Sequence, residues 1–241
     1  MKKFLGLILI ASAIISCSSD KDKMVVTGNI QGLKKGVLYL QKFQDTTFVT
    51  VDSLKIDGDS HFTFTTSIKE PEAYYLYLNK YDGNAVNDRI LFFGEKGTIN
   101  INTTRDYFEG EAKIEGSKGS EVYAEYNKMI SKFSAQNLNY IKEEFEAKKE
   151  GDTARVDSIE KAQNRNMTRR YLYTLNYALN NKDSYVAPYI ALADAYNAKV
   201  KFLDTIYKSL TPEVSTSKYG KALGDYIDEI KKEEKQQDSI K

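Results

Sequence analysis

Cysteine, histidine and tryptophan are nearly absent from this sequence, whose 241 residues include one Cys, one His and no Trp. A single cysteine cannot close a disulfide within the chain, and one cysteine with one histidine cannot form a zinc site of the His/Cys type. A Ser-His-Asp triad would depend on His61 alone, and no G-x-S-x-G, P-loop or G-x-G-x-x-G pattern occurs. We therefore expect a protein that is not an enzyme and that holds no metal and no cofactor.

An excess of charge of one sign is also missing. The chain has 35 Lys and Arg against 34 Asp and Glu; without Lys2 and Lys3 the numbers become 33 and 34, a net charge of −1. A near-neutral chain lacks the basic surface that binds nucleic acid. The 41% apolar and 12% aromatic residues are enough for a folded core, of one domain or two small ones.

The amino terminus has the pattern of a secretory signal. A basic start, Met1–Lys3, precedes an uncharged apolar run from Phe4 to Ile15. As a helix this run would span roughly 18 Å, well short of a bilayer core of about 30 Å. The pattern predicts a signal peptide over residues 1–16 that is cleaved rather than a transmembrane helix.

The end of this run, Ile14-Ile15-Ser16-Cys17, resembles the lipobox of bacterial lipoproteins. The resemblance implies cleavage between Ser16 and Cys17, acyl chains such as palmitate on Cys17, and attachment to a membrane through that lipid. The alternative is an ordinary signal peptide with a chance cysteine. Residues 17–23 then form a polar tether, and Ser18 favours the outer membrane, on either the periplasmic or the outer surface.

Residues 24–116 show the short alternating runs of β-strands. Asp57-Gly58-Asp59 is typical of a turn rather than a metal loop, and Gly94–Gly97 of a hairpin between its neighbours. His61 alternates with Phe62 and should be exposed. The pattern predicts an antiparallel β-sandwich with strands at 24–30, 36–43, 48–56, 61–66, 74–78, 90–93 and 98–102.

Residues 117–235 change to a helical period. Ser120 is a candidate N-cap, and Gly151 separates the first helix from one that Asp152 begins. The first helix should bury an apolar face, and residues 236–241 should form a frayed tail. The apolar positions of that face are Val122, Tyr126, Met129, Ile130, Phe133, Tyr140, Ile141 and Phe145. The expected helices are 120–150, 152–181, 184–197, 202–210 and 217–235, which gives an α+β fold.

Both parts resemble a family of Bacteroidota lipoproteins, the thioredoxin-family thiol:disulfide interchange lipoproteins, whose N-terminal region is the domain of unknown function 4369. The resemblance lies in the order of several short segments: 26–30, 32–33, 36–40, 51–53, 56–58 leading to Phe62, 70–71, 114–117, 183–187, 206–210 and 217–221. Longer members continue into a thioredoxin domain with a C-x-x-C. This sequence stops at Lys241 without one, so the resemblance implies the fold, anchor and envelope location but no redox activity.

Three hypotheses for the function follow. The first is a non-catalytic envelope lipoprotein that binds or positions a partner, for which the resemblance suggests a separate thioredoxin-like protein. The second is a ligand- or nutrient-binding protein, or a hydrolase with unrecognised carboxylates. The third is a structural spacer at the outer membrane.

Few side chains stand out as binding residues. Tyr75 and Tyr77 share a strand face that can stack on a ligand or fill a core, and the lack of Trp weakens the case for a sugar platform. Arg165, Arg169 and Arg170 can meet an anion or a lipid headgroup, or can form a solvated helix face.

Overall fold

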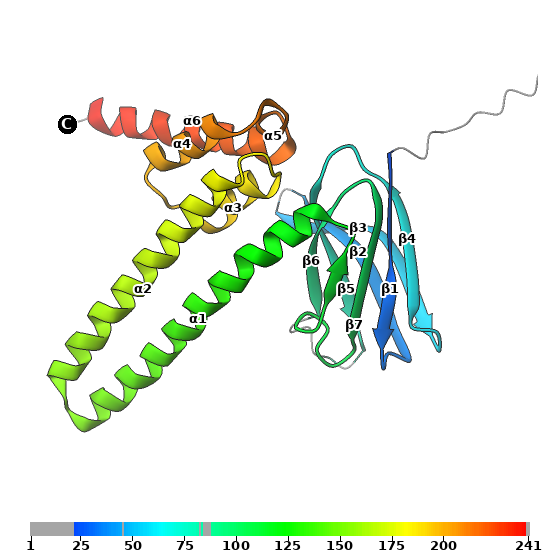
Figure 1. Ribbon diagram of the computed structural model, residues 1–241, viewed down its shortest axis with the longest axis horizontal. Helices are drawn as coiled ribbons and strands as arrows, with labels where there is room; N and C mark the ends of the chain where they lie inside the picture. Colours follow the sequence, from blue (N-terminus) through cyan, green and yellow to red (C-terminus); the bar gives the residue numbers. More distant parts are fainter. Residues whose placement is uncertain (1–21, 45, 82, 84–87, 240–241) are drawn as a thin grey trace, which may run out of the picture.

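The computed structural model describes residues 22–44, 46–81, 83 and 88–239. The predicted signal peptide, the cleavage site at Ser16 and Cys17, and residues 17–21 of the tether lie outside the described residues. The described part contains eight strands in two sheets, followed by six helices (Figure 1). The prediction of an α+β fold, with a β-sandwich before a helical region, is confirmed.

The strands form two sheets of four, and neither sheet consists of four consecutive strands. One sheet, sheet A, has the order β4-β1-β7-β8; the other, sheet B, has the order β3-β2-β5-β6. All pairs are antiparallel except β1 and β7, which are parallel. The strands are β1 Lys23–Gln31, β2 Lys35–Gln44, β3 Thr47–Asp57, β4 His61–Ser67, β5 Glu72–Asn79, β6 Arg89–Gly94, β7 Gly97–Thr104 and β8 Lys113–Glu115.

Two local expectations about the strands were wrong. Gly94–Gly97 does not close a hairpin, because β6 lies in sheet B and β7 in sheet A, so this turn crosses from one sheet to the other. Strand β8 was not expected, since its three residues are too short to show an alternating pattern. The Asp57–Asp59 turn is confirmed: Gly58, with φ 100°, joins β3 to β4.

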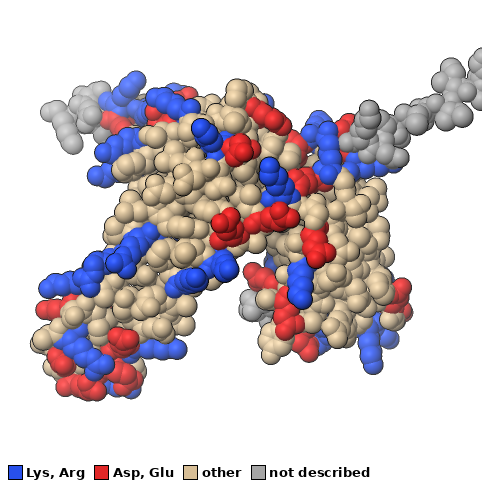
Figure 2. All heavy atoms as spheres, in the orientation of Figure 1, with Lys and Arg blue, Asp and Glu red and all other residues tan. Residues whose placement is uncertain are grey.

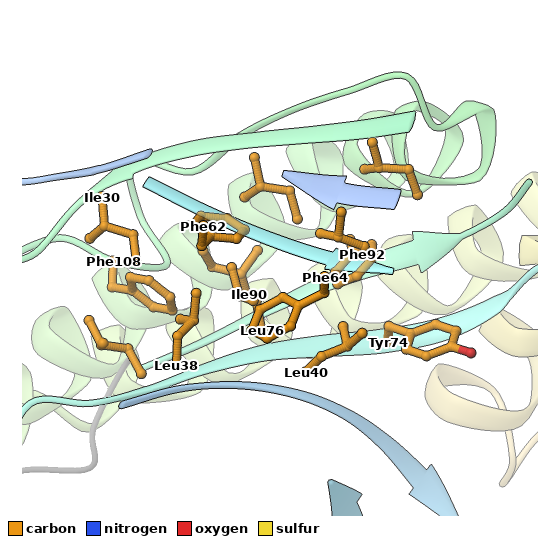
Figure 3. Close-up of a cluster of buried hydrophobic side chains, with 14 of the residues drawn as sticks. Ile30, Leu38, Leu40, Phe62, Phe64, Tyr74, Leu76, Ile90, Phe92 and Phe108 are labelled. Atoms are coloured by element: carbon orange, nitrogen blue, oxygen red, sulfur yellow. The ribbon is translucent and has the colours of Figure 1, made fainter. Parts of the chain in front are cut away.

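The core of the sandwich consists of the inward-facing side chains of both sheets (Figure 3). Strand β1 shows why the sequence alternates: Met24, Val26, Gly28 and Ile30 are buried, while Val25, Thr27 and Asn29 between them are half-buried. Burial of this apolar surface provides most of the stability of such a fold. The other core side chains are Leu33, Leu38, Leu40, Ile56, Phe62, Phe64, Ile68, Tyr74, Leu76, Leu78, Ile90, Phe92, Ile99, Ile101 and Phe108.

The first two helices begin at capping side chains. Ser117 rather than Ser120 is the N-cap of the first helix, because the Ser117 side chain accepts a hydrogen bond from Ser120 N. Asp152 caps the second helix as expected, after Gly151 at φ 72°. The helices are α1 Lys118–Glu150, α2 Thr153–Asn180, α3 Val186–Asp194, α4 Val200–Ser209, α5 Pro212–Ser215 and α6 Lys218–Ser239.

Helix α6 continues four residues past the expected end at 235, since no Gly or Pro interrupts its charged and Gln-rich end. Helix α3 is shorter than expected at both ends, and α5 is an extra short helix that starts at Pro212. No helix in the described ranges is long and apolar enough to cross a membrane.

Helices α1 and α2 form a long antiparallel hairpin that leaves the sandwich and ends at Gly151, while α3, α4, α5 and α6 gather at the other end of α2 (Figure 1). A second apolar core holds this helical cluster together. Its buried residues are Leu175, Ala178, Ala187, Ala191, Ala195, Ala198, Leu203, Ile206, Leu210, Val214, Leu223 and Ile227. The molecule thus has a sandwich, a helical cluster and a projecting hairpin.

Gly28 allows β1 to sit between β4 and β7. A Cβ atom at this position would lie 1.8 Å from Ile101 O and 3.0 Å from Phe62 Cζ. Gly28→Ala should therefore lower the free energy of unfolding by at least about 2 kcal/mol, because backbone must move to make room. The measurement is urea unfolding followed by circular dichroism.

Gly110→Ala is the matched control, since a Cβ atom there would have no neighbour within 4 Å. Equal unfolding midpoints for the two variants would contradict the close approach at Gly28.

Candidate functional site

The first turn of α1 is attached to the free edge of sheet B. Strand β6 is an edge strand, and its last part is covered by two serines of α1. Phe93 N donates to Ser120 Oγ at 2.8 Å, and Ser117 Oγ donates to Phe93 O at 2.7 Å. Both serines are buried. These two bonds pair the polar backbone groups of Phe93 and fix where α1 leaves the sandwich.

Around this attachment, which we call the junction, tyrosines from four helices pack on the outer face of sheet B. Tyr126 is fully buried, and its hydroxyl bonds Thr174 Oγ1 and Asp194 Oδ2, both at 3.0 Å. Tyr177 Oη donates to Val122 O at 2.7 Å, and Ala73 N donates to Tyr219 Oη at 3.1 Å. The aromatic cluster therefore holds α1, α2, α3 and α6 against the sandwich. Its buried members are Ala73, Phe93, Tyr126, Tyr177, Val186 and Ile190.

A cleft of about 650 Å³ opens beside the junction, between α1 and the edge of the sandwich. This volume lies within the range of ligand-binding pockets. Three separate parts of the chain line it: strand β6, the β7–β8 connection with β8, and one side of α1. The side chains that we use below are Leu91, Asp106, Glu109, Tyr123, Ala124, Asn127 and Lys128.

The wall formed by β6 carries unused backbone groups. Because Phe93 N and O point to the free edge, the alternation of an antiparallel strand directs N and O of Leu91 to the same edge. No described residue bonds either group, and Leu91 is only half-buried. The cleft thus contains an open strand edge, which is the usual place for an additional strand to pair.

The polar side chains of the cleft lie mostly at its rim. Asp106 is 73% exposed and forms an ion pair with Arg105 at 2.7 Å. Glu109 and Lys128 are exposed as well. Deeper in, burial raises the pKa of Tyr123, while its hydrogen bond with Asn127 acts in the opposite direction. The cleft therefore offers neutral hydrogen-bonding groups inside and charges of both signs outside.

Tyr75 and Tyr77 lie half-buried on the outer face of sheet B, as the strand pattern indicated. The Tyr77 ring stacks on that of Tyr39 with centroids 5.7 Å apart. The guanidinium of Arg89 lies 4.3 Å from the Tyr77 ring and 4.5 Å from the Phe48 ring. Packing against neighbouring side chains of the sheet explains why both tyrosines are half-buried.

Arg165, Arg169 and Arg170 are exposed on α2, and the first two border a shallow depression of about 360 Å³. His61 is 74% exposed and bonds Asp59 through Nδ1 at 2.8 Å. No group of three or more His, Cys, Asp or Glu side chains suited to a metal ion occurs among the described residues. The structure does not bring the arginines and the tyrosines into one site.

Comparison with known families assigns the sandwich. Residues 24–123 match the family model named Domain of unknown function (DUF4369). This segment is similar to the DUF4369 family. It covers 100 of the 241 residues and includes the whole sandwich and the start of α1 as far as Tyr123. No curated protein and no solved structure matches the chain.

The junction serines lie within the matched segment. Ser117 and Ser120 both fall inside residues 24–123, so this segment includes the cover for the end of β6. The cleft extends past this boundary, since Ala124, Asn127 and Lys128 also line it. The cleft was not predicted from the sequence, because its walls are far apart in the chain. The one available signal was the pair Ser117 and Ser120 at the start of a long helix.

The buried tyrosines of the junction should make the protein unstable at high pH. Burial is the main cause that raises the pKa of Tyr126, Tyr177 and Tyr219 above the usual value near 10. Above about pH 10 the unfolded chain loses phenolic protons that the folded chain retains, so the free energy of unfolding should fall as pH rises. Urea midpoints at about pH 8 and about pH 11 measure this fall.

Absorbance of tyrosinate provides the companion measurement, because some of the phenols should titrate only as the protein unfolds. A midpoint that stays constant over this interval would contradict the burial of these hydroxyls.

Proposed function

We propose that this protein is a non-catalytic binding module of the cell envelope, held on a membrane by lipid on Cys17, whose cleft binds an extended polypeptide segment of a partner. The observation that carries the proposal is the open edge of β6 at Leu91 inside a cleft of about 650 Å³. An extended peptide can add to such an edge through its main chain, while its side chains enter the adjacent pocket.

Two features of the cleft favour a peptide over a substrate to be hydrolysed. Leu91 N and O have no bonding partner among the described residues, and a main chain supplies one acceptor and one donor for them. The carboxylates at the rim, Asp106 and Glu109, are exposed, whereas a general acid of a hydrolase is usually kept protonated by burial. A polar rim around a partly apolar wall is typical of a binding surface.

The envelope location rests on the amino-terminal sequence and on the resemblance to lipoproteins that carry the DUF4369 domain. Outer-membrane sorting, as Ser18 favours, would hold the module near other envelope proteins. A separate thioredoxin-like protein is the partner that the resemblance suggests. Because lipid on Cys17 would attach the protein to the membrane, the cleft would not be needed for attachment and could bind the partner.

Peptide binding can be tested by blocking the cleft. Ala124 lines the cleft on α1, so Ala124→Trp should fill it and weaken binding at least about tenfold. The probe is an array of extended decapeptides, with affinities of selected sequences measured by fluorescence polarisation on the mature chain. Ala135→Trp is the matched control, because Ala135 is also exposed on α1 but does not line the cleft.

If no decapeptide binds below about 100 µM, or if both tryptophan variants bind equally well, the cleft is not the binding site.

The anchor has an independent test. Cells that express the full chain should incorporate an alkyne-tagged palmitate into it, and Cys17→Ala should abolish the label because the acceptor thiol is gone. Ser18→Ala, which leaves the thiol in place, should keep the label. Label on the Cys17→Ala variant would rule out this attachment site.

A further inference from the structure

The outer half of the α1–α2 hairpin has very little core. In residues 127–173, all of which the structure describes, only Ala147, Ile159 and Asn166 are buried. The two helices meet along a seam at Tyr126, Phe133, Tyr140 and Ala147, which are spaced by seven residues. Across it, Asn166 Nδ2 donates to Phe133 O at 2.9 Å, and Gln163 Nε2 to Glu144 Oε2 at 3.0 Å. Two helices with so narrow a contact leave their other apolar side chains uncovered.

An uncovered apolar stripe runs along α1 beside this seam. Leu138 is 52% exposed, Ile141 50% and Phe145 58%. Ile141 directly follows the seam residue Tyr140, while Leu138 and Phe145 follow Asn137 and Glu144, which are half-buried on the same side of α1 as the seam. The stripe therefore lies about 100° around the helix from the seam. Asn127, which follows Tyr126, lies in the same column and lines the cleft. The stripe therefore continues the cleft side of α1 outward, beyond the sandwich.

Helix α2 contributes to the same side of the hairpin. In an antiparallel pair of right-handed helices, residues that directly follow seam positions point to one common side. Met167 follows Asn166 and is 53% exposed; Asp157 and Glu160 follow Val156 and Ile159. We call this side the hairpin face: Leu138, Ile141, Lys142, Phe145 and Lys149 from α1, with Asp157, Glu160 and Met167 from α2.

The charges of the hairpin face are divided by helix. Lys142 and Lys149 flank the stripe on α1, and Lys149 Nζ lies 4.3 Å over the Phe145 ring. Asp157 and Glu160 occupy the α2 edge, and neither they nor Lys142 form an ion pair within the described part of the chain. Lys149 also pairs with Glu146 at 3.2 Å, so the charges left for a partner are Lys142 on the α1 edge and Asp157 and Glu160 on the α2 edge. A two-fold rotation of a second copy brings these opposite charges together.

We propose that the hairpin face binds the hairpin face of a second copy of this chain, with the two-fold axis parallel to the hairpins. This rotation exchanges the edges, so α1 of each copy lies over α2 of the other. Lys142 and Glu160 are each nine residues from Gly151, so Lys142 lies level with Glu160 of the second copy. The apolar stripe then packs in the middle of a four-helix arrangement.

Charge argues against a membrane as the occupant. Residues 142–161 contain five basic and seven acidic side chains, a net charge of −2, and Figure 2 shows both signs mixed at the tip of the hairpin. Anionic headgroups attract faces with an excess of Lys and Arg. A second copy satisfies both edges.

The area of the hairpin face determines how strongly two copies are expected to associate. Residues 134–151 span about 25 Å, and two adjacent helices are about 20 Å wide, which gives about 500 Å² per copy. The total of about 1,000 Å² is at the lower limit for a specific complex. The dimer should therefore dissociate in the range of tens of µM, and attachment of both copies to one membrane would strengthen it.

Sedimentation equilibrium of the mature chain, residues 17–241 with Cys17→Ser, tests the proposal up to about 100 µM. A monomer–dimer equilibrium is expected, and Phe145→Gln should weaken it at least about tenfold. Leu172→Gln is the matched control: Leu172 is 48% exposed on α2 but does not belong to the hairpin face. Since both side chains are exposed, urea midpoints should show that both variants remain folded.

The edge charges give a more specific test. Lys142→Glu and Glu160→Lys should each weaken the dimer, and the double variant should restore it because the two edges are again of opposite sign. A double variant that is no stronger than either single variant refutes the edge-to-edge pairing. A chain that remains monomeric at the highest concentration, or that dimerises equally well with Phe145→Gln, overturns the proposal.

Discussion

The open edge of strand β6 is the constraint on which the rest of the structure depends. Every sandwich with open sheets has unpaired backbone groups at its edges, and those groups must be covered or left in water. Here the first turn of α1 covers the last part of β6, through the two serine bonds at Phe93. The connection between the sandwich and the helical region is thus also the cover of the strand edge, and the segment that matches the family model includes it.

Partial cover has a consequence for binding. Helix α1 leaves the sandwich at an angle (Figure 1). Its serines bond Phe93, whereas Leu91, two residues earlier on the same edge, lines the cleft and has no backbone hydrogen bond to α1. The junction tyrosines hold α1 rigidly at this angle, because their rings and hydroxyls connect it to α2, α3 and α6. A segment that binds in the cleft would meet a preformed site, which lowers the entropic cost of association.

The sequence allowed the sandwich to be predicted because strands such as β1 bury one face, as Met24, Val26 and Ile30 do. Strand β3 is an exception, since only Ile56 of its eleven residues is buried. It did not allow the order of strands within the sheets to be predicted, since alternation does not specify the neighbour of a strand; the crossing at Gly94–Gly97 followed from pairing alone. The cleft was beyond reach for a related reason. Its walls at Leu91, Glu109 and Asn127 become neighbours only when two sheets and a helix have been assembled.

The helical period of the sequence predicted α1 correctly, but it did not predict which apolar residues of α1 are buried. The apolar arc of α1 includes both Tyr140, which lies in the seam with α2, and Ile141 and Phe145, which remain half exposed or more. Periodicity cannot separate these groups, because one helix neighbour covers only part of an apolar arc. An apolar arc wider than the seam leaves side chains such as Ile141 and Phe145 uncovered, and the proposed pairing of two hairpin faces would bury them. Near the sandwich, the side of α1 next to the seam faces the cleft and the edge of the sandwich. Farther out along α1, no described residue covers this side.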